Sequence, residues 1–284
     1  MAFVFSIIRL LRLKQWLKNL LLLFPPLFGG VLFFPATLRE LLPPLLAFCL
    51  ASSANYAFND VLDAEKDALH PSKKLRPIPA GAVSKGAALM TSGALFCAAF
   101  LCAGAASWAV VALLAAYVAL MGCYSLWLKH VVLFDIFVIA TGFLLRLEAG
   151  ARAVHVPVST WLFLSVFFLA MFLSIGKRVS EKSMLADDAA AFHRRTLAQY
   201  PDTYLDGAML MAGTAAMLTY ALYTVDHAHL LYTVPLCCLG LFRYVFWIKT
   251  GKTGDPSEAL LKDPLLAGIS AVWLVTVIGA KYFS

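Results

Sequence analysis

Four side chains with oxygen donors, Asn59, Asp60, Asp63 and Asp67, follow one another where a long apolar run of the sequence ends. If one helix continues through this stretch, a rotation of about 100° per residue places all four within one quadrant of its surface. Clustered carboxylates repel each other and are unfavourable beside hydrocarbon, so divalent cations are the expected counter-ions. Oxygen-only ligands suit Mg²⁺, which shares its coordination shell with substrate phosphates. The spacing therefore predicts a site for magnesium and pyrophosphate.

The same charges also fit a solvated helix end in which the acids pair with Lys66, Lys73 and Lys74. The shared face of the acids, and a further asparagine one turn earlier at Asn55, favour the metal site over that simpler interpretation. The sequence then continues from Arg76 into Pro-Ile-Pro-Ala-Gly. Proline cannot continue a helix, so we expect the chain to break there and the loop to turn back.

The segments that must position this motif are apolar. Of the 284 residues, 62% are hydrophobic and 14% are charged, whereas an average soluble domain is about 25% charged. Nine segments are apolar over about 20 residues, which is enough to cross a bilayer core of roughly 30 Å. They cover approximately residues 17–36, 42–59, 87–104, 108–127, 131–150, 158–176, 207–226, 229–248 and 264–283. We therefore predict an all-α polytopic membrane protein with about nine transmembrane helices in a single domain, residues 1–284.

The distribution of basic residues predicts the orientation. Most of the 23 lysines and arginines lie at the N-terminus and in alternate connections, whereas the opposite connections hold Arg39, Arg152 and Lys281. This bias places the N-terminus and the polar loops in the cytoplasm. The polar loops cover about residues 60–86, 177–206 and 249–263. The predicted location is a bacterial-type inner or plasma membrane, with the acidic motif facing the cytoplasm.

Composition also restricts the partners. The net charge of +7 fits the topology and an attraction to membrane lipids or phosphate, and we expect no nucleic-acid partner. The six cysteines lie in apolar runs without CxxC spacing, so we expect buried small side chains and neither a metal site nor a disulfide. Small residues inside the apolar segments let helices approach closely, which would permit a homo-oligomer.

The motif N-D-x-x-D-x-x-x-D, with the R-P-I-P-A-G that follows it, resembles the first aspartate-rich motif of the UbiA superfamily of intramembrane prenyltransferases. That superfamily is all-helical, with nine transmembrane segments around a central cavity, which agrees with the segment count. Within it, the chain is most similar to the decaprenyl-phosphate (polyprenyl-phosphate) phosphoribosyltransferases, nearly end to end. Leu13 stands where those enzymes usually have a proline. The matching stretches are K-Q-W-L-K-N at 14–19, Y-S-L-W-L-K-H at 124–130, G-F-L-L-R-L-E-A-G at 142–150, G-K-R-V-S-E at 176–181 and L-F-R-Y at 241–244.

The resemblance implies an enzyme that transfers 5-phosphoribose from 5-phosphoribosyl-1-pyrophosphate to a polyprenyl phosphate lipid, releases pyrophosphate and uses Mg²⁺. In this hypothesis Asp60, Asp63 and Asp67 are catalytic and hold Mg²⁺ together with Asn59. The substrates are bound by Lys18, Arg76, Tyr124, Lys129, Lys177, Arg178 and Glu181. Simple anchoring at the membrane boundary is the alternative role for Lys18 and for Tyr124.

Two other functions remain open. A UbiA-type prenyltransferase, which moves a prenyl group from a prenyl diphosphate to an aromatic or lipid acceptor, would use the same acidic motif. Such enzymes usually carry a second aspartate-rich motif after the sixth segment, where this chain instead has Lys177 and Arg178, fixed positive charges suited to phosphate. Asp202 and Asp206 form a D-x-x-x-D about 20 residues later, and the sequence leaves open whether they bind a second metal. A transporter would need charges deep in several segments and two similar halves; the sequence has few such charges and no convincing repeat.

Three charged residues of the fifth apolar segment are not assigned to catalysis. We expect Arg146 and Glu148 near its outer end, where they snorkel to the interface or pair with other charges. Asp135, near Lys129, fits either structural pairing or support of the phosphate site.

Overall fold

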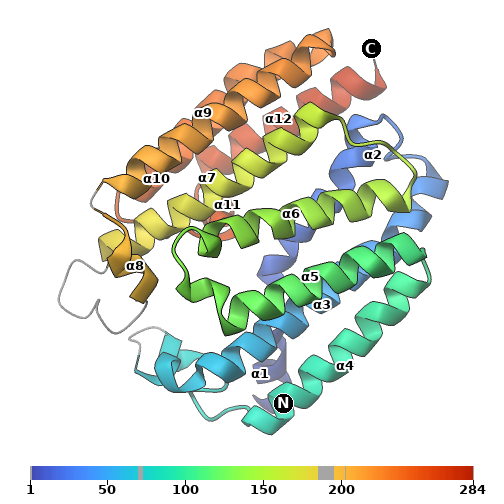
Figure 1. Cartoon of the computed structure of the whole chain (residues 1–284). Coiled ribbons are helices and arrows are strands. Elements are labelled where there is room, and N and C mark those ends of the chain that lie inside the picture. The colour runs from blue at the N-terminus through green and yellow to red at the C-terminus, as the bar shows by residue number, and fades with distance from the viewer. Residues whose placement is uncertain (1, 70–72, 185–194, 202, 284) are drawn as a thin grey trace.

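The computed structural model describes residues 2–69, 73–184, 195–201 and 203–283. These residues form helices joined by short turns and contain no strands. Neighbouring long helices pack side by side, as α3 does with α4 and α7 does with α9, in one bundle (Figure 1). The all-helical prediction is therefore confirmed for the described part of the chain.

The helices of the first half surround the acidic motif. They are α1 (Ala2–Leu11), η1 (Leu13–Leu23), α2 (Phe24–Phe28), α3 (Pro35–Ala68), η2 (Lys73–Leu75), α4 (Lys85–Gly104), α5 (Trp108–Leu126), η3 (Leu128–His130) and α6 (Phe134–Ala153). The second half completes the bundle. Its helices are α7 (Thr160–Met184), α8 (Arg195–Gln199), α9 (Tyr204–Val225), η5 (Ala228–Thr233), α10 (Val234–Lys249), α11 (Pro256–Lys262) and α12 (Pro264–Tyr282).

Seven helical segments of the described chain are long and apolar enough to cross a membrane. They are Pro35–Ala68, Lys85–Gly104, Trp108–Leu126, Thr160–Ser183, Tyr204–Val225, Ala228–Lys249 and Pro264–Tyr282. The two other predicted segments are also helical but differ in character. Helix α6 carries several charged residues, and the stretch predicted at 17–36 is divided into η1, α2 and a turn. The predicted count of nine is thus approximate.

Helix α3 is the element that carries the acidic motif. Its 34 residues correspond to a length of about 51 Å, well beyond a bilayer core of roughly 30 Å. The apolar segment predicted at 42–59 is therefore only its central part, and the helix continues through the motif to Ala68. Near its start, two prolines, Pro43 and Pro44, lie inside the helix. The continuation past residue 59 is what places the four oxygen donors on one helix.

The two ends of the bundle differ. The end of α3, η2 and α8 lie at one end, and α2 and the C-terminus lie at the other (Figure 1). At the second end the backbone N–H of Leu32 donates to the hydroxyl of Tyr282, over 2.8 Å, so the turn after α2 is joined to the end of α12 there. The polar side chains of the motif therefore gather at the end opposite to the C-terminus.

Glycines at helix crossings let backbones come close where the site is built. A Cβ added to Gly150 of α6 would lie 2.0 Å from the carbonyl oxygen of Leu22, so only glycine fits where α6 crosses η1. A Cβ at Gly254 would lie 2.7 Å from the Cα of Lys177, where the connection after α10 crosses α7. Close approach of this kind is how membrane helices associate without a hydrophobic drive. Both crossings bring polar residues towards the interior of the bundle.

Candidate active site

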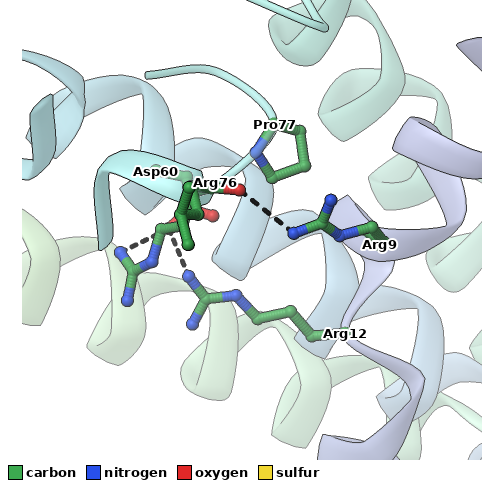
Figure 2. Close-up of a pocket in the computed structure, with 6 residues that line it drawn as sticks. Arg9, Arg12, Asp60, Arg76 and Pro77 are labelled. Atoms are coloured by element: carbon green, nitrogen blue, oxygen red, sulfur yellow. Dashed lines mark hydrogen bonds and ion pairs between the residues drawn. The ribbon is translucent and has the colours of Figure 1, made fainter. Parts of the chain in front are cut away.

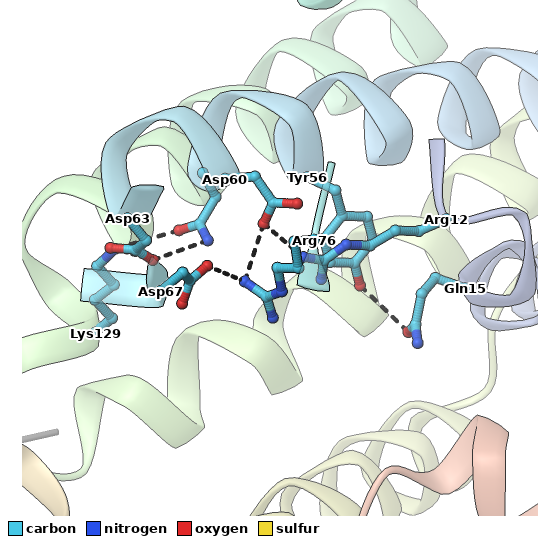
Figure 3. A network of polar contacts seen from close by, with 9 residues as sticks. Arg12, Gln15, Tyr56, Asp60, Asp63, Asp67, Arg76 and Lys129 are labelled. Carbon is cyan, nitrogen blue, oxygen red and sulfur yellow. Dashed lines mark hydrogen bonds and ion pairs between the residues drawn. The ribbon is translucent and has the colours of Figure 1, made fainter. Parts of the chain in front are cut away.

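At the acidic end of α3, Asn59 and Asp63 form one pair with a lysine. The Nδ2 of Asn59 donates to Asp63 Oδ2 over 3.0 Å, as expected for residues one helical turn apart. The Nζ of Lys129, which η3 places here, donates to Asp63 Oδ1 over 2.8 Å and to Asn59 Oδ1 over 3.2 Å. Lys129 is buried, and its ammonium lies between the two oxygen donors (Figure 3).

Asp60 and Asp67 form a second pair with arginines. The Nη1 of Arg76 donates to Asp60 Oδ1 over 3.1 Å and to Asp67 Oδ2 over 2.5 Å, so one guanidinium joins both carboxylates. Arg12 donates to the same Asp60 oxygen. Figure 2 shows both arginines converging on Asp60, at a pocket lined by Arg9, Arg12, Asp60, Leu75, Arg76 and Pro77. Arg76, which directly follows η2, therefore lies back against α3.

The three carboxylates of the motif are balanced by three cations of the chain. Within the described residues, no group of three or more His, Cys, Asp or Glu side chains is arranged to hold a metal ion. The donor set nevertheless fits Mg²⁺ in its chemistry, because it offers only carboxylate and amide oxygens. The ammonium of Lys129 lies beside the oxygens of Asp63, and the guanidinium of Arg76 lies beside those of Asp60 and Asp67. A bound cation would have to take their place beside the acids.

Arg12 is a residue of this cluster that the sequence did not single out. It joins α1 to η1 in the left-handed conformation, with φ 50° and ψ 50°, which is uncommon for a residue other than glycine and costs about 1–3 kcal/mol. The bend aims its guanidinium at Asp60 and places it 4.9 Å from the ring centroid of Tyr56. Nothing in the spacing of the sequence indicates this contact, because 48 positions separate Arg12 from Asp60.

A second cluster joins Lys18, Lys177 and Asp255. The Nζ atoms of Lys18 and Lys177 lie 3.8 Å and 3.5 Å from the same oxygen, Asp255 Oδ2. The other oxygen accepts from the backbone N–H groups of Ser257 and Glu258 and so caps α11. Burial would raise the pKa of Asp255, but the two lysines and these N–H groups hold it below its usual value. The sequence D-P-S-E could have indicated that a helix starts here, but it does not indicate the contacts between Asp255 and the two lysines.

A third cluster gathers Tyr124, Asp135 and Glu181 around Arg178. The Nε of Arg178 donates to Asp135 Oδ2 over 2.7 Å, and its Nη1 donates to Glu181 Oε2 over 2.8 Å. Its Nη2 reaches the hydroxyl of Tyr124 over 3.2 Å. Asp135 also accepts from the hydroxyl of Tyr200. The structure thus brings three predicted site residues together, with the guanidinium of Arg178 directed at protein groups and Asp135 in the structural pairing.

The position of Arg146 differs from the one expected from the sequence. It was expected to snorkel outwards or to pair with another charge, yet only 7% of it is exposed and it lies inside the bundle. Its Nε donates to Asn19 Oδ1 over 2.7 Å and its Nη2 donates to the hydroxyl of Tyr117 over 2.8 Å. The close crossing at Gly150 explains this position, because η1 covers the face of α6 that carries Arg146. Glu148, by contrast, pairs with Arg152 at 3.8 Å, as expected.

The D-x-x-x-D of the later loop is only partly described. Asp206 accepts from Lys249 Nζ over 2.7 Å with each of its two oxygens. Both side chains of this ion pair are substantially exposed. Asp202 lies outside the described residues. The described half of this motif is therefore an exposed ion pair between α9 and α10.

The chain has relatives of known family. The profile of the UbiA prenyltransferase family matches residues 22–275. A decaprenyl-phosphate phosphoribosyltransferase of Mycolicibacterium smegmatis is 32% identical, over 99% of this chain and 94% of that protein. A decaprenyl-phosphate phosphoribosyltransferase of Corynebacterium glutamicum is 33% identical, over 98% of this chain and 87% of that protein.

The fold matches a solved structure as well. A UbiA homolog from Archaeoglobus fulgidus, bound to DMAPP and Mg²⁺, superimposes with a TM-score of 0.74, over 97% of this chain and 99% of that one. The two sequences are 20% identical, so this likeness concerns the fold alone. The bundle described above is therefore an arrangement that also occurs in a protein with a bound prenyl diphosphate and a divalent cation.

Proposed function

Because this chain belongs to the UbiA prenyltransferase family, we propose that it transfers 5-phosphoribose from 5-phosphoribosyl-1-pyrophosphate to a polyprenyl phosphate, with release of pyrophosphate. The products would be the phosphoribosylated lipid phosphate and pyrophosphate. The relatives named as decaprenyl-phosphate phosphoribosyltransferases support the reaction, since this chain aligns with them over nearly its whole length. The acidic site would face the cytoplasm, where such a soluble and highly anionic donor is available.

The observation that carries the proposal is the presence of two separate charged clusters, one acidic and one basic. Asp60, Asp63 and Asp67 provide oxygen ligands, whereas Lys18 and Lys177 provide positive charge around Asp255. A prenyltransferase with two aspartate-rich motifs would need carboxylates in place of the second cluster. Here Lys177 stands after the sixth predicted segment, and Asp206 is engaged by Lys249. This arrangement suits two anionic substrates, one bound through a metal at the acidic cluster and the other at the basic cluster. It suits less well a single diphosphate held between two metals.

The acidic cluster would bind the donor. Asn59, Asp60, Asp63 and Asp67 would hold Mg²⁺, which would neutralise charge on the departing pyrophosphate. Arg76 and Lys129, which now neutralise the same carboxylates, would then be placed to donate to phosphate oxygens. Arginine suits that role because its guanidinium can donate two parallel hydrogen bonds to phosphate.

The chain's remaining contribution would be to position the substrates. The attacking group is the phosphate of the lipid, which is already anionic, so the step needs no strong general base. Holding the two reactants in line converts the encounter into an intramolecular step and can lower the barrier by about 7–11 kcal/mol. Arg178 and Tyr124 would hold neighbouring side chains in place and would not contact the substrate directly, because Arg178 is directed at Asp135 and Glu181. The lipid chain would lie against the apolar faces of the bundle.

The function can be tested with labelled donors. Purified protein, or membranes containing it, would receive labelled phosphoribosyl pyrophosphate with polyprenyl phosphate. A second reaction would receive labelled prenyl diphosphate with an aromatic or a lipid acceptor. We expect label in the lipid fraction only in the first reaction, and only with Mg²⁺ present. Label transferred from prenyl diphosphate alone would contradict the proposal.

The metal ligands can be tested in the same assay. Asp63→Asn is expected to lower turnover at least about 100-fold, because a lost contact to developing charge typically costs that much. Glu65→Gln is the matched control, since Glu65 lies on the same helix and pairs with exposed Lys85 away from the cluster. Near-normal, Mg²⁺-dependent turnover by Asp63→Asn would show that Asp63 is not a ligand.

A further inference from the structure

The two lysines beside Asp255 lie too far from its carboxylate to form hydrogen bonds with it. Their Nζ atoms lie 3.8 Å and 3.5 Å from Asp255 Oδ2, beyond the usual range of about 2.7–3.2 Å for a hydrogen bond. Within the described part of the chain, neither ammonium donates a hydrogen bond to the protein. Each has three N–H donors. The pair is thus attracted to one carboxylate without being bonded to it.

The position of Asp255 is built by the surrounding structure. The connection between α10 and α11 is held by Ser180 Oγ, which donates to the carbonyl of Lys252 over 2.9 Å. The hydroxyl of Tyr244 donates to the carbonyl of Gly254 over 2.7 Å. Because Gly254 packs directly on the backbone of α7, Asp255 enters the bundle beside Lys177. A cluster at a mobile surface would lack these restraints.

More positive charge lies nearby than the acid can balance. Lys18 is within electrostatic range of both Asp255 and Arg146. Arg146 is buried, and the groups that accept its hydrogen bonds are all neutral: the amide of Asn19, the carbonyl of Gly142 and the hydroxyl of Tyr117. Lys18 and Lys177 thus share one carboxylate, and Arg146 lies near Lys18, so a single acid cannot balance all of this positive charge. Uncompensated charge inside a membrane protein is unfavourable, so an anion of similar charge is the expected occupant.

We propose that Lys18 and Lys177 form a phosphate-monoester subsite, in which the phosphate competes with Asp255 for the two ammonium groups and Arg146 adds positive charge near Lys18. A phosphate monoester carries about −1.5 to −2 charge near pH 7 and three acceptor oxygens, which matches both the charge and the free donors. The subsite is separate from the acidic cluster of α3, where metal and pyrophosphate would bind. This inference rests on the proposed function, whose two substrates both carry a phosphate monoester: the lipid phosphate and the 5-phosphate of the donor.

Equilibrium binding without turnover tests the subsite. The full-length protein in detergent, with a chelator to remove Mg²⁺, would be titrated with a short polyprenyl phosphate and separately with ribose 5-phosphate. The corresponding polyprenol, which lacks the phosphate, measures the contribution of the lipid chain alone. We expect Lys18→Gln and Lys177→Gln each to weaken binding of one phosphate probe about tenfold or more, with polyprenol binding unchanged. The probe that is affected identifies the source of the monoester.

Two further variants keep the test decisive. Lys262→Gln removes an exposed lysine of the same helix α11, paired with Glu258, and should change neither affinity. Asp255→Asn retains a side chain that can cap α11 but removes the competing negative charge, so it should bind the affected probe several-fold more tightly. Weaker binding by Asp255→Asn, or unchanged binding of both probes by both lysine variants, would overturn the subsite.

The outcome is distinguishable from a failure of the proposed function. If the wild-type protein transfers labelled phosphoribose yet the lysine variants bind both probes normally, the function stands and the subsite is wrong. If the wild-type protein binds a phosphate probe through Lys18 and Lys177 but transfers no phosphoribose, the subsite stands and the reaction is wrong.

Discussion

Two of the three carboxylates of the site are paired with a cation from a distant part of the chain. Lys129 approaches Asp63 across 66 positions, and Arg12 approaches Asp60 across 48. Breaking a buried pair by removing one partner is strongly unfavourable, because the other charge remains buried and unpaired. The acids therefore need counter-ions in every state of the protein. In the proposed cycle the chain's own cations and Mg²⁺ would alternate in that role.

The pairing at Asp255 predicts how stability depends on pH. Its folded pKa lies below the ordinary value of about 3.9. The carboxylate therefore contributes stability that is fully present above that value and is lost as the pH falls through the folded pKa. Asp255→Asn removes this contribution. We expect the unfolding temperature of the variant to fall less between about pH 5 and pH 3 than that of the wild type, measured in the same detergent.

That comparison has a clear opposite outcome. If the unfolding temperatures of the two proteins fell equally over the acid range, the ionised form of Asp255 would contribute nothing to folding. The two lysines would then lie too far from its carboxylate to stabilise it. Lys262→Gln, at an exposed position of the same helix, serves as the control for a change of one charge.

At the scale of helices, the position of the site depends on a few close crossings. Gly150 lets α6 contact η1 through backbone atoms, and this contact brings Asn19 to Arg146. The unusual 3-10 helix η1 spans 11 residues, longer than most of its kind. It places Lys18 and Asn19 side by side, one towards Asp255 and the other towards Arg146. A change at the crossing should therefore disturb both clusters together.

Alanine substitution at this crossing is a direct test. Gly150→Ala would place a methyl group 2.0 Å from the carbonyl oxygen of Leu22, so we expect a loss of about 1–3 kcal/mol of stability from overpacking. Gly93→Ala is the matched control, because a Cβ there meets nothing within 4 Å and alanine is the better helix former. Thermal unfolding in detergent would compare the two. Equal stability of both variants would mean that η1 can move away from α6 without loss.

For the molecule as a whole, the acidic motif lies at the end of the bundle opposite to the C-terminus (Figure 1). Asp60, Asp63 and Asp67 lie at that end, together with the cations that face them (Figure 3). From the bias of lysine and arginine in the sequence, we propose that this end faces the cytoplasm. The proposed donor is soluble and the proposed acceptor is a lipid, so a site at one end of a membrane bundle gives each substrate its own route.

Cysteine labelling tests the proposed orientation. In a variant without the six native cysteines, Lys85→Cys places a single thiol at the start of α4, and Trp108→Cys places one at the start of α5, just beyond the other end of α4. Both positions are exposed. A membrane-impermeant maleimide added to intact cells should label Trp108→Cys and leave Lys85→Cys unreacted until the cells are opened. The reverse pattern would place the acidic motif outside the cytoplasm.

Much of this protein could be predicted from local pattern. Apolar runs identify membrane helices because the bilayer requires about 20 residues of low polarity. The spacing of Asn59, Asp60, Asp63 and Asp67 identifies one helical face because the helix repeats every 3.6 residues. Their grouping in the structure confirms that geometry, whereas their role as metal ligands stays a prediction. The nine segments became seven clear spans, since charge in α6 and the division of residues 17–36 weaken the apolar signal.

Only the tertiary structure decided which charges meet. Arg146 sat in an apolar segment and was expected at the membrane surface, yet the crossing at Gly150 covers it with η1. No pattern in the sequence indicated that Asp255 lies beside two lysines or that Arg12 pairs with Asp60. Sequence alone determined the class of protein and the acidic helix face, because both follow from repeats within one segment. The pairing of charges depends on where separate helices cross, and side-chain contacts between distant segments leave no periodic trace in one sequence.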